Sequence, residues 1–162
     1  DPFTFRKTPE SQEISKYREI ARIEKPLIIH VRRGDYSQED NFGILGPNYY
    51  SESISKIESI LPIDNIWLFS DEPENALKLF STEQRSKIRV IEEVDNRPSH
   101  TLEVMRLGSS YIIANSTFSW WAARSAYNSS PPVVAPATWF KGMNPPLDLI
   151  PKSWHLIKSD FL

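Results

Sequence analysis

The sequence predicts an α/β fold, a Rossmann-like parallel sheet flanked by helices. Short apolar runs alternate with longer segments in which apolar residues recur at helical spacing. The runs are continuous rather than alternating, which is typical of parallel strands buried on both faces. Thirteen prolines separate the segments. A chain of 162 residues has the size of one domain, so we expect residues 1–162 to form a single domain.

The first half of the chain contains three helix–strand alternations. Ile14, Tyr17 and Ile20 fall on one face of a helix, and Pro26 and Pro62 mark the ends of two helical segments. We expect helices over 11–23, 48–61 and 73–80, and strands over 27–31, 66–69 and 89–91.

The second half continues the same alternation. Leu102 and Met105 define a helical face, and the run at 111–114 is apolar throughout. We expect helices over 101–107 and 118–127, strands over 111–114 and 133–135, and a weakly signalled last strand over 154–157.

The composition excludes several classes of binding partner and of chemistry. A net charge of −2 argues against a nucleic-acid partner, which requires a broad basic surface. No apolar stretch approaches the roughly 18 residues of a membrane span, which leaves peripheral membrane association open. The absence of cysteine excludes disulfides and thiolate chemistry, and the three histidines lie far apart, so we expect no metal site. We expect a cytoplasmic location, including the inner face of a membrane.

Residues 30–36 read HVRRGDY and follow the first predicted strand. The planar fork of arginine donors suits the paired oxygens of a phosphate, so Arg32 and Arg33 predict a site for a phosphorylated ligand. The alternative is a surface cluster of salt bridges. His30 shares a strand face with Arg32, where it either contacts the ligand or is an interior histidine.

Two further polar segments follow predicted strands, at 70–72 and 115–117. Ligands of open parallel sheets bind beyond the carboxyl ends of the strands, so all three segments should meet at one edge. Ser116 and Thr117 begin a predicted helix, where they either cradle an anion or cap the helix. Trp120 and Trp121 point about 100° apart on that helix, so at least one of them should pack in the core.

The chain resembles the α-1,2-fucosyltransferases of glycosyltransferase family 11. The signature HxRRGDY is matched at 30–36, and further blocks follow in the order and spacing of the family. The matching blocks are 30–36, 42–43, 49–50, 68–71, 112–122, 134–136 and 139–140.

This resemblance implies a GT-B architecture, in which two Rossmann-like domains face a cleft and no metal or cofactor is needed. The chain is similar to the C-terminal half, which binds the donor GDP-fucose, and the N-terminal acceptor domain is expected to be a missing part of the same polypeptide. By resemblance, Arg32 grips the donor pyrophosphate and Arg33 supports it. Ser116, Thr117 and Ser119 are expected to face the donor phosphates.

The implied reaction transfers L-fucose to the 2-hydroxyl of a galactoside acceptor, with inversion. Arginine donors and a helix N-terminus would stabilise the charge that grows on the departing GDP. The acceptor hydroxyl needs a general base, for which Asp35 and Asp40 are the candidates. Asp35 is slightly favoured, although a salt bridge to an arginine is its alternative role.

The chain also departs from the family pattern. Thr101 stands where the family usually has an acidic residue thought to face the donor, and Glu103 lies two residues later. We therefore include Glu103 and His30 among the expected donor-binding residues, with recognition of the donor base left open. Two other functions remain open: transfer from another nucleotide sugar on the same scaffold, and a non-catalytic sugar-binding module.

Overall fold

A computed structural model describes residues 10–38, 41–144, 146 and 148–162 of the chain. Its central feature is one sheet of six strands in the order β3-β2-β1-β4-β5-β6, with every neighbouring pair parallel. The α/β class is therefore confirmed. The strands are β1 (Leu27–Val31), β2 (Ile66–Ser70), β3 (Ile88–Val90), β4 (Ser110–Ile112), β5 (Val133–Pro136) and β6 (His155–Ile157).

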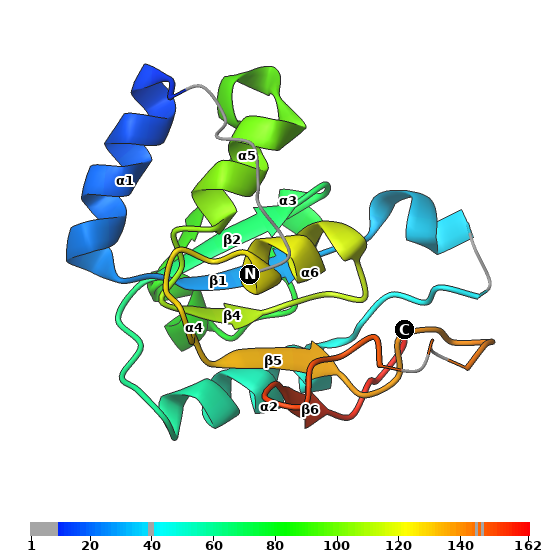
Figure 1. Cartoon of the computed structure of the whole chain (residues 1–162). Helices are drawn as coiled ribbons and strands as arrows, with labels where there is room; N and C mark the ends of the chain where they lie inside the picture. Colours follow the sequence, from blue (N-terminus) through cyan, green and yellow to red (C-terminus); the bar gives the residue numbers. More distant parts are fainter. Residues whose placement is uncertain (1–9, 39–40, 145, 147) are drawn as a thin grey trace.

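Helices cover both faces of this sheet (Figure 1). One face packs against α1, α5 and α6, and the other packs against α2 and α3. The helical segments are α1 (Gln12–Glu24), η1 (Gly34–Gln38), α2 (Pro47–Glu58), α3 (Pro73–Leu77), α4 (Thr82–Ser86), η2 (Val94–Asn96), α5 (Pro98–Met105) and α6 (Thr117–Arg124).

The two-residue period of the strands divides the core between these faces. In β1, Leu27, Ile29 and Val31 point to the layer of α2, whereas Ile28 points to the layer of α1 and α5. In β2, Trp67 lies on the side of α1, where its ring meets Tyr17 edge-on at 5.5 Å between centroids. Burial on both faces explains why these strands are continuous apolar runs in the sequence.

The strand order fixes the position of a binding site. From β1 the chain moves outward to β2 and β3, then returns to the other side of β1 for β4, β5 and β6. The order therefore reverses between β1 and β4, and a crevice opens there beyond the carboxyl ends of the strands. The polar segments after β1, β2 and β4 lie at this edge, as the sequence predicts.

The region between β2 and β3 contains one more helix than the sequence analysis predicts. The helix expected over 73–80 ends at Leu77, and the separate helix α4 follows. Ser81 caps α4 by accepting a hydrogen bond from the Gln84 N–H at 3.2 Å, while the Gln84 side chain accepts from the Ser81 N–H at 2.9 Å. This capping box is readable in the sequence as Ser-x-x-Gln.

The remaining predicted helices and strands are present with shifted ends. Helix α5 begins at Pro98, three residues before the predicted start, because proline is suited to the first helical position. Helix α6 ends at Arg124, before the predicted Tyr127. The weakly signalled last strand is confirmed as β6, which pairs with β5 in parallel through Val134↔His155.

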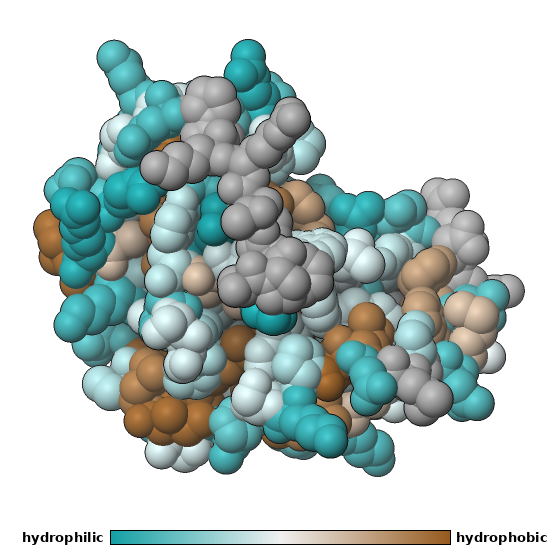
Figure 2. Space-filling model, viewed as in Figure 1, coloured by the Kyte–Doolittle hydropathy of each residue, from teal (hydrophilic) through white to brown (hydrophobic). Residues whose placement is uncertain are grey.

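The exterior in the view of Figure 2 is mainly hydrophilic, with apolar colour in separate patches. Large apolar side chains that are exposed include Ile23, Ile60, Leu156 and Leu162. None of the helices described has both the length and the apolar character that a membrane span requires.

Candidate functional site: a cavity at the carboxyl ends of the strands

A cavity of about 640 Å³ lies at the switch point between β1 and β4 and extends across the end of β2 to β3. Its volume is within the range of small-molecule sites. Its lining combines basic, acidic, hydroxyl and aromatic side chains. The lining residues are His30, Arg32, Asp35, Tyr36, Phe69, Ser70, Asp71, Ile91, Glu93, Pro98, Thr101, Ser116, Thr117 and Phe118.

Arg32 is the principal cation of this cavity, and two carboxylates hold its guanidinium group. Its Nε and Nη2 atoms donate to Asp35 Oδ1 at 3.1 and 2.8 Å, and Nη1 lies 3.5 Å from Asp71 Oδ2. The guanidinium also lies over the ring of Tyr36, 5.5 Å from its centroid. Arg32 thus forms salt bridges and also lines the cavity, so a salt-bridge cluster and a phosphate site at this residue are compatible.

Asp71 ties the loop after β2 to the loop after β1. Its Oδ1 atom accepts a hydrogen bond from the Arg33 N–H at 3.0 Å. A Cβ atom on Gly34 would lie 2.5 Å from Asp71 Oδ2, so only glycine permits this close approach. The structure therefore explains the glycine in the HVRRGDY segment, because the missing side chain leaves room for Asp71 to reach the backbone beside Arg32.

The side chain of Arg33 does not line the cavity. Its Nε atom donates to Glu72 Oε2 at 3.2 Å, and Asn75 Nδ2 donates to the same oxygen at 3.0 Å. These hydrogen bonds lower the pKa of the Glu72 carboxyl, that of Asn75 most. The structure therefore places Arg33 behind Arg32, as a bridge between the β1 and β2 loops.

His30 forms part of the cavity wall but is only 6% exposed. Its Nδ1 atom has no hydrogen-bond partner among the described residues, and its ring meets Phe118 at 6.1 Å between centroids. Burial, and secondarily the positive charge of Arg32, lower the pKa of His30 to about 3. The imidazole is therefore neutral at physiological pH, with one nitrogen that donates and one that accepts.

This lowered pKa has a measurable consequence for stability. An unfolded histidine has a pKa of about 6.5, so between pH 6.5 and about 3 the unfolded chain binds a proton that the folded chain does not. The contribution of His30 to the free energy of unfolding should therefore fall with decreasing pH, by up to about 1.4 kcal/mol per pH unit. Urea unfolding at a series of pH values should show a shallower acid dependence for His30→Gln than for the wild type. Parallel curves for the two proteins would contradict the effect.

The third polar segment supplies the start of α6. Ser116 is the N-cap residue, and the side chains of Ser116 and Thr117 both line the cavity. The Ser116 side chain makes no capping hydrogen bond, so the cap alternative from the sequence is not realised. The first turn of α6 therefore presents backbone N–H groups and two hydroxyls toward the cavity. Ser119 is buried and does not line the cavity; its hydroxyl donates to the Ser116 carbonyl at 3.2 Å.

The structure does not bring Glu103 to the cavity. Glu103 is buried between α1, α5 and the segment after α6, where it contacts the Tyr127 hydroxyl, pairs with Arg106 at 2.7 Å and lies 3.8 Å from Arg18. Helix geometry explains this placement: Thr101 of the same helix lines the cavity, and a residue two positions later points about 200° away from it. Asp40, the second candidate base, lies outside the described residues.

Several residues of the cavity are not among the site residues expected from the sequence. Asp71 is part of the polar segment recognised after β2, without an assigned role. Glu93 is missed altogether, although the rule applied to the other strands, polar residues just beyond a strand end, identifies it after β3. Tyr36 and Phe118 flank the expected polar residues and complete the wall.

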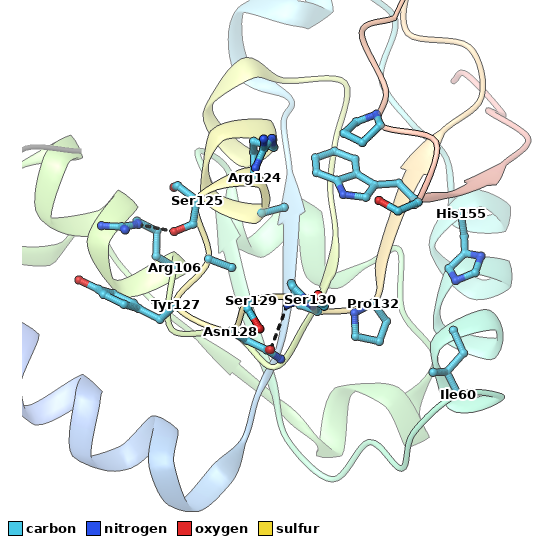
Figure 3. A pocket seen from close by; sticks show the side chains of 16 residues that line it. Ile60, Arg106, Arg124, Ser125, Tyr127, Asn128, Ser129, Ser130, Pro132 and His155 are labelled. Carbon is cyan, nitrogen blue, oxygen red and sulfur yellow. Dashed lines mark hydrogen bonds between the residues drawn. The ribbon is translucent and has the colours of Figure 1, made fainter. Parts of the chain in front are cut away.

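A second hollow, larger at about 1020 Å³, lies elsewhere (Figure 3). It opens between the last turn of α6 with its following loop and the segment that leads into β6. Arg124 and His155 lie on opposite sides of it, and the loop of Asn128, Ser129 and Ser130 closes the bottom. This hollow faces the C-terminal end of α6, where the helix dipole disfavours anions, and it lacks the loops that follow β1 and β2.

The adjacent tryptophans of α6 serve packing. Trp120 donates its Nε1–H to the Leu149 carbonyl at 2.9 Å and meets Trp121 and Trp154 at 4.8 and 5.9 Å between centroids. Neither Trp120 nor Trp121 lines the cavity. Within the described ranges, no group of three or more histidine and acidic side chains is arranged to hold a metal ion.

Comparison with known proteins identifies the family of this chain. The model of glycosyl transferase family 11 matches residues 14–142, which include every strand except β6 and all three polar loops. The chain belongs to glycosyl transferase family 11. The residues named above as lining the cavity, from His30 to Phe118, all lie within the segment that matches family 11.

Two curated relatives of this family 11 chain come from Escherichia coli. The O-antigen biosynthesis glycosyltransferase WbnK is 32% identical over 120 residues, covering 72% of this chain and 39% of the relative. An alpha-1,2-colitosyltransferase is 27% identical over 148 residues, covering 87% of this chain and 50% of the relative. The chain thus spans half or less of the length of these two relatives.

Proposed function

We propose that this chain is the donor-binding half of an inverting glycosyltransferase that transfers L-fucose from GDP-fucose to the 2-hydroxyl of a galactoside acceptor. The observation that carries the proposal is the pairing of Arg32 with the first turn of α6 across one cavity. Both are donor-rich and positively polarised, which is the arrangement that binds a phosphate. The acceptor half, and with it the GT-B cleft, would come from the remainder of a longer polypeptide, as the partial coverage of the relatives suggests.

The cavity residues account for the chemistry of the leaving group. When the bond from the sugar to the GDP oxygen breaks, negative charge grows on the β-phosphate. Arg32 and the N–H groups at the start of α6 stabilise this charge more in the transition state than in the ground state. These groups supply the positive charge that a metal ion supplies in other transferases, so we propose that the reaction needs neither a metal nor a cofactor.

Asp35 is the candidate base that the structure describes. Its carboxylate lines the cavity, and one of its oxygens accepts both hydrogen bonds from Arg32. Donor phosphate and Asp35 therefore compete for the same guanidinium. We propose that phosphate binding draws Arg32 away and leaves the Asp35 carboxylate to accept the proton of the acceptor hydroxyl. Asp40 remains the alternative base.

The deciding measurement is calorimetric titration of the chain in the presence of EDTA. We expect GDP and GDP-fucose to bind under these conditions, UDP to bind at least tenfold more weakly, and free galactosides to give no heat. Binding that requires added Mg²⁺ would contradict the metal-free proposal. Binding of galactosides without GDP would identify a sugar-binding module, and a preference for UDP would identify a different nucleotide-sugar transferase.

The sugar of the donor has a second candidate. The name of the second relative specifies transfer of colitose in an α-1,2 linkage, whereas the name of WbnK gives no sugar. Transfer of colitose from its GDP derivative uses the same phosphate site. Titration with the two GDP-sugars side by side separates these donors.

A further inference from the structure

The loop between β3 and α5 forms part of the cavity wall beyond the end of β3. The loop contributes Ile91 and Glu93, and the first residue of α5 contributes Pro98; none of them belongs to the three polar segments described above. Strands β1 and β3 are separated by β2 alone, so their ends lie about 10 Å apart at the usual strand spacing. A nucleoside spans such a distance from its phosphates to the edge of its base. With a diphosphate at Arg32, this loop is therefore within the reach of the base.

Side-chain contacts support an uncommon backbone conformation in this loop. Asp95 and Asn96 adopt left-handed φ angles of 53° and 51°, which cost free energy in residues other than glycine, although less in aspartate and asparagine than in most. The Asp95 carboxylate accepts a hydrogen bond from the Ser11 hydroxyl at 2.5 Å and lies 2.7 Å from His100 Nδ1. Backbone strain that several contacts maintain in this way clusters at ligand sites.

Two further hydrogen bonds fix the backbone next to Glu93. The next residue, Val94, is 4% exposed, and its N–H donates to Thr101 Oγ1 at 2.9 Å. The Thr101 hydroxyl in turn donates to the Arg97 carbonyl at 3.3 Å. Thr101 lines the cavity, but its hydroxyl is used in these hydrogen bonds with the loop. The position where the family usually has an acidic residue therefore serves in this chain to orient the backbone at Val94, next to Glu93.

Three carboxylates line the cavity, and they differ in their partners. Asp35 and Asp71 are engaged by Arg32 and by the N–H of Arg33. Glu93 is exposed and has neither a hydrogen bond nor an ion pair to any residue that the structure describes. Its neighbours on the wall, Ile91 and Pro98, are apolar and suit the face of a base.

We propose that Glu93 selects guanine by accepting hydrogen bonds from the N1–H and the 2-amino group of the base. Guanine presents these two donors side by side, matching the two oxygens of a carboxylate. Uracil has a single N–H between two carbonyl groups, and adenine has an acceptor beside its amino group, so neither satisfies a carboxylate in this way. The inference rests on the proposed function, because it requires the diphosphate at Arg32.

The test compares GDP with inosine diphosphate, which differs from GDP only in lacking the 2-amino group. We expect the wild type to bind GDP about tenfold more tightly than inosine diphosphate, as loss of one charge-assisted hydrogen bond predicts. Glu93→Gln should weaken GDP binding about tenfold and reduce the preference to less than about threefold. An unchanged thermal midpoint would show that the exposed substitution leaves the fold intact.

Glu92→Gln is the matched control. Glu92 is the adjacent exposed glutamate, it does not line the cavity, and its charge acts on Tyr17 of α1 instead. This variant should keep the wild-type preference for GDP. Persistence of the full preference in Glu93→Gln, or its loss in Glu92→Gln, would overturn the assignment of Glu93 while leaving GDP binding in place. Failure of the wild type to bind any nucleoside diphosphate would overturn this inference together with the proposed function.

Discussion

Replacement of Arg32 by alanine is expected to weaken GDP binding by about 100-fold. The guanidinium group supplies two charge-assisted hydrogen bonds to a phosphate, and their loss amounts to about 3 kcal/mol. Arg32→Lys should be intermediate, because it keeps the charge and loses the planar fork. Calorimetric titration of each variant with GDP, under the conditions used for the wild type, measures the effect.

Arg22→Ala provides the control for a general loss of positive charge. Arg22 lies on the outer surface of α1, where it pairs with Glu19 at 3.0 Å, and both side chains are exposed. GDP binding by this variant should equal that of the wild type. Wild-type affinity in Arg32→Ala would refute the phosphate site and leave the salt-bridge cluster with Asp35 and Asp71 as the whole role of Arg32.

Asn115→Asp is expected to have the largest effect on stability. The side chain of Asn115 is 1% exposed, and its Nδ2 atom donates to the carbonyls of Phe42, Gly43 and Trp139 at 2.9, 3.2 and 3.1 Å. A carboxylate of the same shape would direct an oxygen at these carbonyls and place an unpaired charge in the core. The free energy of unfolding should fall by about 3 kcal/mol or more. Urea unfolding followed by tryptophan fluorescence is the measurement.

Asn128→Asp is the matched change on the surface. Asn128 is exposed and uses its side-chain oxygen to accept a hydrogen bond from the Ser130 N–H, which an aspartate can also do. Its free energy of unfolding should remain within about 0.5 kcal/mol of the wild type. An equally small effect at Asn115 would show that the three carbonyls are not held by this amide. Both asparagines begin an Asn-x-Ser/Thr tripeptide, and burial makes the one at Asn115 inaccessible in the folded chain.

The sequence predicts the strands more reliably than the helices. Each apolar run from Leu27 to Val134 is a strand of the sheet, because burial on both faces demands a continuous apolar pattern. Helix ends depend on local capping, which hydrophobic spacing does not record. The capping box at Ser81, and Pro98 at the first position of α5, move those boundaries by several residues.

The sequence also predicts which loops line the cavity, but not which of their side chains do so. Strand polarity alone places Arg32, Asp71 and Ser116 at one edge. Arg33 and Glu103 have the charge and the proximity in sequence that suggest a ligand contact, yet they turn to Glu72 and Arg106 instead. Helix and loop geometry decides such a choice, and a shift of one or two residues along an element is enough to turn a side chain away from the cavity.

Two properties of this protein follow from the sequence by itself: a parallel α/β sheet, and an arginine-containing polar edge at the ends of its strands. Both depend on local chemistry, namely apolar periodicity and polar residues that directly follow strands. The tertiary structure alone decides that Arg32 is held between Asp35 and Asp71, that Gly34 must lack a side chain, and that Glu93 completes the cavity. Arg32 and Asp71 are 39 positions apart in the sequence and Arg32 and Glu93 are 61 apart, and only the order of strands in the sheet brings them to one cavity.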